Sequence, residues 1–176
     1  MSLIARKDKE RIADTKTDTT SIIATAATNA SALKKCVVKT DGAVLNGLDP
    51  IFTISGGPVR CKIAGIVTTP VGSTTTNLRL QHITTTPAAT VDLNAGAVAC
   101  TSDAAGTLYY NVGATSVFTP VAAGFVILDP VTVEETEFIL NPGVVQCLGS
   151  AATTGVIAWY MTYEPLSPSS VVTAAT

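Results

Sequence analysis

From Cys36 onward, short apolar and β-branched runs alternate with turn signals such as Asp41-Gly42 and Asn46-Gly47. The runs recur about every 8–12 residues, which is typical of strands in sandwiches and barrels. The expected strands are residues 36–40, 43–47, 50–55, 59–69, 77–86, 107–113, 124–128, 131–135, 137–140, 143–149 and 155–164. The pattern predicts an all-β fold over residues 36–176, an antiparallel β-sandwich of jelly-roll-like type.

The last expected strand, "GVIAWYMTYE", is apolar on both of its faces. A strand with one wet face alternates apolar and polar residues, since successive side chains point to opposite sides. One face would hold Val156, Ala158 and Tyr160, and the other Ile157, Trp159, Met161 and Tyr163. We therefore expect one face in the core and the other against a neighbouring copy. The interface hypothesis names Trp159, Tyr160, Met161, Tyr163 and Leu166.

The two ends of the chain differ from the rest in composition and in hydrophobic pattern. Residues 1–18 are half charged and have no apolar period, which predicts a charged N-terminal arm or short helix over residues 1–35. Within it, residues 19–35 combine Ala and Leu, which favour a helix, with Thr and Ile, which favour an extended segment, and both conformations stay open. Two prolines and then small residues at the C-terminus predict a tail that runs extended over the surface.

Charge is scarce and unevenly distributed. The chain of 176 residues is 47% hydrophobic and only 14% charged, which favours burial of its outer surface against copies of itself or against another protein. All 11 Lys and Arg lie in the first 79 residues, which carry a net charge of +5, and the rest carry −7. The asymmetry has two interpretations: orientation on a charged partner surface, or a solvated arm with acidic loops. On the first interpretation, the arm would anchor the chain to its partner through Arg6, Lys7, Lys9 and Arg11.

The cysteines and the N-terminus bear on the cellular compartment. Cys36, Cys61, Cys100 and Cys147 are far apart and form no C-x-x-C pair, which favours reduced thiols that act as small core side chains. Two disulfides are the alternative that the even count permits. The first residues lack the apolar stretch of a signal peptide, and we expect neither secretion nor a membrane partner.

The chain shows no cluster that carries a chemistry. His82 is the only histidine, and we expect a half-exposed or hydrogen-bonded strand residue, since a metal site or catalytic base would need a second ligand or partner. Glu134, Glu135 and Glu137 are typical of a solvated turn, with calcium as the alternative. No phosphate-binding loop and no uncompensated basic stripe is present. We therefore expect no enzyme activity and no cofactor, and nucleic acid is an unlikely partner.

The C-terminal segment "NPGVVQCLGSAATTGVIAWYMTYEPLSPSSVVTAA" resembles the end of small accessory virion proteins of tailed bacteriophages. These often close on a strand of the form W-x-x-x-Y-x-P-L, matched here by Trp159, Tyr163, Pro165 and Leu166. The resemblance covers about 35 residues and none of the first 35. It implies a β-sandwich protein, commonly trimeric, located on the particle as a decoration protein, a head fibre or another surface component.

These observations together predict a structural virion protein, specifically a capsid decoration protein that binds and stabilises the shell as an oligomer. Its expected partners are further copies of itself, as a trimer, and the major capsid protein or another virion protein. Its expected location is the virion, assembled in the host cytoplasm. The alternatives are a head fibre, connector or tail-associated component, or a carbohydrate- or receptor-binding β-module, for which Tyr109 and Tyr110 are the candidate platform.

Overall fold

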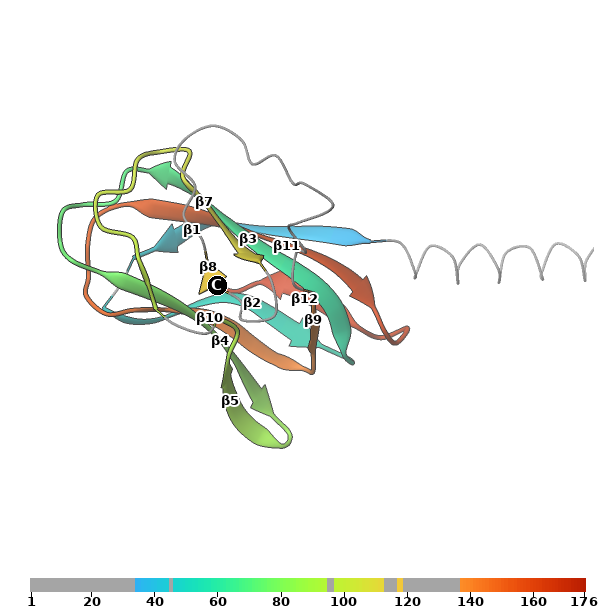
Figure 1. Ribbon diagram of the computed structural model, residues 1–176. Helices are drawn as coiled ribbons and strands as arrows, with labels where there is room; N and C mark the ends of the chain where they lie inside the picture. The colour runs from blue at the N-terminus through green and yellow to red at the C-terminus, as the bar shows by residue number, and fades with distance from the viewer. Residues whose placement is uncertain (1–33, 45, 95–96, 113–116, 119–136) are drawn as a thin grey trace, which may run out of the picture. The chain divides into compact units, whose positions relative to one another are not determined.

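A computed structural model describes residues 34–176, apart from residue 45 and the segments 95–96, 113–116 and 119–136. Residues Lys34–Thr176 form one compact unit. Within the described residues all regular structure is β, and the strands lie in two layers (Figure 1). The expectation of an all-β antiparallel sandwich is confirmed.

The first sheet contains β1 (Lys35–Ala43), β3 (Val59–Thr69), β7 (Leu108–Val112), β8 (Val117–Phe118), β9 (Phe138–Leu140) and β11 (Val156–Pro165). Its order is β1-β11-β3-β7-β8, and β9 also pairs with β3. The second sheet contains β2 (Gly47–Ser55), β4 (Asn77–Thr85), β5 (Ala88–Asp92), β6 (Val98–Ala99), β10 (Gly143–Gly149) and β12 (Val171–Ala174). Its order is β12-β2-β10-β4-β5, and β6 also pairs with β4.

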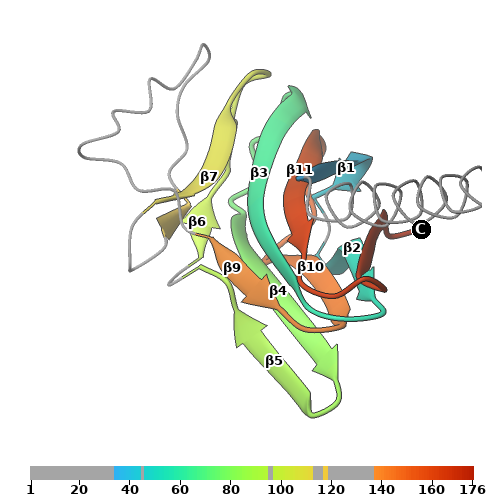
Figure 2. The ribbon, with the colours of Figure 1, turned by 90° about the vertical axis from the view of Figure 1, so that its right-hand side faces the viewer.

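The strand pairs are nested within one another. The pair β4–β5 is innermost in sequence, β3–β7 and β2–β10 follow, and β1–β11 is outermost. All these pairs are antiparallel. Figure 2 shows the result from the side, with β1, β11 and β3 in one curved layer and β2, β10 and β4 in the other.

The core lies between the layers because alternate residues of each strand point inward. Fully buried side chains come from both sheets, among them Ile51, Phe52, Leu80, Tyr109, Val145 and Met161. Trp159, the only tryptophan, is 2% exposed and stacks on Tyr109 with 6.4 Å between the ring centroids.

The Trp159 ring lies against two glycines. A Cβ added at Gly65, the residue opposite Trp159 on β3, would come within 2.8 Å of the indole, and a Cβ added at Gly42 on β1 would also come within 2.8 Å of it. No side chain fits at either position, so both strands carry glycine where the ring covers them. The two glycines therefore mark close packing.

Several element boundaries differ from the sequence prediction. The expected turn at Asp41-Gly42 is wrong: these residues belong to β1, and the pairing with β11 shifts register between Lys39 and Gly42 as in a bulge. The expected strand over residues 43–47 is also wrong, because β1 ends at Ala43 and β2 begins at Gly47. The strands β5 and β6 were not expected at all. The strands expected over 124–128 and 131–135 lie outside the described residues.

The C-terminal tail does run extended, but as a strand of the second sheet. Residues Val171–Ala174 of β12 pair with β2, and Val172 is buried in the core. The Lys39 ammonium of β1 donates to the Ala175 carbonyl at 2.9 Å and lies 3.1 Å from Asp41 Oδ1. This contact joins the edge of the first sheet to the edge of the second.

Candidate subunit interface

The outer face of the first sheet is apolar across four strands. Since Trp159 points into the core, its neighbours in sequence point outward. Two adjacent outward rows, read across the pairing, are Val38–Tyr160–Ala64–Tyr110 and Ala158–Ile66–Leu108. Val38 is 37% exposed, and the others apart from Ala158 are partly buried. We call these seven residues the outer apolar patch.

Charged and polar residues lie beside the patch on the same face. The next outward row is Cys36–Thr162–Lys62. Beyond it, Arg60 on β3 pairs with Glu164 on β11 at 3.5 Å, and Lys34 lies 3.8 Å from Glu137. An apolar centre with a polar margin is the usual anatomy of a protein–protein interface.

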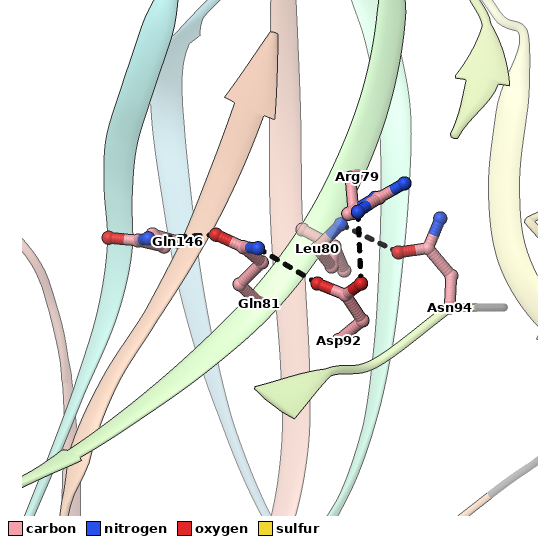
Figure 3. A network of polar contacts seen from close by, with 6 residues as sticks. All are labelled: Arg79, Leu80, Gln81, Asp92, Asn94 and Gln146. Atoms are coloured by element: carbon pink, nitrogen blue, oxygen red, sulfur yellow. Dashed lines mark hydrogen bonds and ion pairs between the residues drawn. The ribbon is translucent and has the colours of Figure 1, made fainter. Parts of the chain in front are cut away.

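The outward face of the second sheet has a different middle row (Figure 3). Gln146 on β10 donates through Nε2 to Gln81 Oε1 on β4 at 3.2 Å. Gln81 Nε2 in turn donates to Asp92 Oδ1 at 2.8 Å, and Arg79 donates to the other carboxylate oxygen at 3.0 Å. The side chains of this row satisfy one another and need no partner chain.

The structure divides the five residues of the interface hypothesis. Trp159, Met161 and Tyr163 are at most 4% exposed and lie in the core of a single chain. Tyr160 lies in the outer apolar patch. Leu166 is 41% exposed after β11, where its N–H donates to the Pro58 carbonyl. The interface hypothesis thus falls on Tyr160 and Leu166 and stays a prediction there.

Sequence reasoning missed most of the patch. Val38, Ala64, Ile66, Leu108 and Tyr110 come from strands whose two faces were not separated. The signal was present in "RCKIAGIV", where Ala64 and Ile66 occupy the face opposite Ile63 and Val67. Which of two apolar faces points inward depends on pairing partners far away in the sequence.

His82 lies beside a hollow of about 510 Å³ between the β4–β5 hairpin and β9. The imidazole is 4% exposed and hydrogen-bonds to the Asn141 backbone, whereas its Nε2 has no partner. Burial lowers the pKa of His82, which keeps the ring neutral. Among the described residues no three His, Cys, Asp or Glu side chains lie close enough to hold a metal ion.

Tyr109 and Tyr110 do not form a common platform. Tyr109 is 1% exposed, and its hydroxyl donates to Asp103 Oδ2. Burial raises the pKa of Tyr109, and the hydrogen bond with Asp103 adds to the effect. Tyr110, the next residue, points outward into the patch. The described part of the chain thus offers one of these two rings to a partner.

The cysteines carry free thiols. Cys61, Cys100 and Cys147 are buried, and Cys36 is exposed. Burial raises the pKa of the Cys61 thiol to about 12 and that of Cys100 to about 11. These values make the two thiols poor nucleophiles at neutral pH, as expected of core side chains.

Some candidate residues lie outside the described residues. These are Arg6, Lys7, Lys9 and Arg11 of the arm and Glu134 and Glu135 of the acidic cluster, whereas Glu137 is described and exposed. The described residues include no helix long and apolar enough to cross a membrane.

Comparison of the chain with protein-family models, with curated proteins and with solved structures finds no match.

Proposed function

We propose that this chain is a structural protein of a bacteriophage particle, a capsid decoration protein that associates with copies of itself through the outer apolar patch. The observation that carries the proposal is the patch: two adjacent outward rows without a charged side chain, on a sheet whose inner face already fills the core. A sheet face of this kind is stabilised when a second protein covers it.

The fold supports the same proposal at a coarser level. The jelly-roll-like topology is part of the proposal, and the nested pairing of β4–β5, β3–β7, β2–β10 and β1–β11 supports it. Viral capsid proteins often use this architecture. Lectin domains use it too, so the fold alone does not separate the proposed function from carbohydrate binding. The single available outward ring in the Tyr109-Tyr110 pair favours assembly over a sugar platform.

Energetics allow the patch to hold a trimer together. Burial of one large apolar side chain is worth roughly 1.5–3 kcal/mol, and each subunit would cover several of them. Obligate interfaces bury about 2,000 Å² or more, so a trimer would also have to cover residues beside the patch. Bound across capsomer joints, such a trimer favours the assembled shell by mass action.

The first experiment measures the mass of the purified full chain by sedimentation. We expect the number of copies in the assembly to be a multiple of three, and we expect Tyr160→Lys to remove that factor of three, because the charge would be buried without a partner. Thr162→Lys is the matched control: it adds the same charge at the next outward position of β11, off the patch. A monomeric wild-type chain, or equal effects of the two variants, would contradict the proposal.

The second experiment locates the chain on particles. On a gel of purified phage particles that contain the chain, its band should approach that of the major capsid protein, as decoration of the whole shell requires. A few copies per particle would instead indicate a head fibre, connector or tail component. Deletion of residues 1–18 should release the chain from particles without dissociating the trimer, if Arg6, Lys7, Lys9 and Arg11 grip the shell.

A further inference from the structure

The outer edge of β5 pairs with no other strand among the described residues. The β4–β5 hairpin extends beyond both layers of the sandwich (Figures 1 and 2). All five residues of β5 are exposed, and the strand pairs only with β4. The unpaired N–H and C=O groups on the other side of such a strand are a template for another strand.

The other long edges carry features that oppose pairing, whereas on β5 the only such feature is the charge of Asp92. On β1 a bulge follows Lys39, and Asp41 adds a charge. On β12 the Lys39 ammonium occupies the Ala175 carbonyl just beyond the strand. The register of β5 against β4 is continuous, and its sequence Ala-Ala-Thr-Val-Asp has no lysine, proline or bulge.

The hydrogen bonds between β5 and β4 determine which backbone N–H and C=O groups of β5 point to the open side. Leu93, just after β5, donates its N–H to the Leu80 carbonyl on β4. Because backbone groups alternate along an antiparallel strand, residues 89 and 91 also point to β4. Ala88, Thr90 and Asp92 therefore point their N–H and C=O groups to the open side.

These features lead us to propose that the free edge of β5 pairs with the β5 edge of a second copy, antiparallel, about a two-fold axis at Thr90. In this register Thr90 faces Thr90 of the second copy, and Asp92 faces the small, uncharged Ala88. Like charges do not meet, and facing threonines are a favourable cross-strand pair. Asp92 is already neutralised by Arg79 at 3.0 Å. This surface is separate from the outer apolar patch, and the inference does not depend on the proposed function.

Two exposed apolar residues beside the β5 edge are also consistent with pairing to a second copy. Val91 is 53% exposed and Ile139 on β9 is 66% exposed, both beside the hollow near His82. In the proposed register Val91 lies next to Ala89 of the second copy on that side. The paired hairpins would form one continuous sheet across the two copies.

Disulfide trapping tests the register. With Cys36→Ser removing the exposed thiol, Thr90→Cys should give a covalent dimer on a non-reducing gel, because facing residues of a hydrogen-bonded pair lie about 5.5 Å apart, within disulfide range. Ala88→Cys is the matched control: the two introduced thiols would lie roughly 13 Å apart along the strands. No dimer from Thr90→Cys, or equal dimer from both variants, would overturn the inference.

A charge pair tests the contact without a covalent bond. Thr90→Lys and Thr90→Glu should each reduce the sedimentation mass of the wild-type assembly twofold, and an equimolar mixture should restore it. Wild-type mass in both single variants would overturn the inference. Tyr160→Lys separates the two proposals: if it alone changes the mass, the β5 contact is wrong, and if only Thr90→Lys does, the patch is wrong.

Discussion

The outward-pointing side chains that cross the middle of each sheet are apolar on the first sheet and polar on the second. On the first sheet the row is Val38–Tyr160–Ala64–Tyr110, and on the second it is Gln146–Gln81–Asp92. The polar row satisfies its own hydrogen bonds, whereas the apolar row offers water only the hydroxyls of Tyr160 and Tyr110. The difference teaches that the two outward faces of one sandwich can differ in kind, one apolar and the other polar with hydrogen bonds among its own side chains.

The largest effect on stability should come from the inner side of the first sheet, which lies in the core. Trp159→Ala should lower the free energy of unfolding by about 3–5 kcal/mol, because the ring fills the space over Gly42 and Gly65. Urea unfolding followed by circular dichroism measures it. A loss below about 1 kcal/mol would mean that the ring is not part of the core.

The next effect should appear in association rather than in stability. Tyr160→Ser removes the part of the ring that is still exposed in the single chain and would be covered at the patch, which should weaken self-association about tenfold. Sedimentation over a dilution series measures this change. A large fall in the free energy of unfolding of the dissociated chain would instead assign Tyr160 a role within one subunit.

A substitution in the polar row of the second sheet should lower stability and leave self-association unchanged. Gln81→Leu leaves the Gln146 amide, whose residue is 4% exposed, without its acceptor, at a cost of about 1–3 kcal/mol of stability. Association should stay unchanged. Thr53→Val, an outward substitution of the same sheet outside the network, serves as the control. Weaker association in Gln81→Leu would make the second face an interface too.

The smallest effect concerns pH and the inner side of the second sheet. Burial lowers the pKa of His82 below its usual value near 6.5, so the unfolded chain binds a proton that the folded chain resists. The stabilisation is complete above pH 6.5 and is lost as the pH falls through the folded pKa. His82→Leu should flatten the fall in unfolding free energy below pH 6.5. An unchanged slope would show that other groups cause the acid sensitivity.

Much of the fold was predictable because the strong strands are marked locally. Residues 59–69 and 143–149 were predicted with the same bounds that β3 and β10 have, since β-branched runs there end at Gly or Pro. Gly42 misled the prediction for a physical reason. An Asp-Gly pair is a usual turn signal, but here Gly42 lies within β1 and leaves room for the indole ring of Trp159, 117 residues later in the chain.

The candidate site was less predictable than the fold. That the last strand is apolar on both faces was visible in the sequence, but both faces contain aromatic residues, so composition did not say which one the core takes. Tyr160 and Trp159 are adjacent in sequence and lie on opposite sides of the sheet. The rest of the patch comes from pairing with β1, β3 and β7, and this register is a property of the whole chain.

The nested pairing also bears on synthesis. Lys39 and Trp159 are partners 120 residues apart, so at about 5–20 residues per second the first strand leaves the ribosome roughly 6–24 s before its partner exists. During that time β1 stays outside any finished sheet, and formation of the native domain requires the last part of the chain. A nascent chain stopped before β11 therefore has its first strand available to chaperones or to other nascent chains.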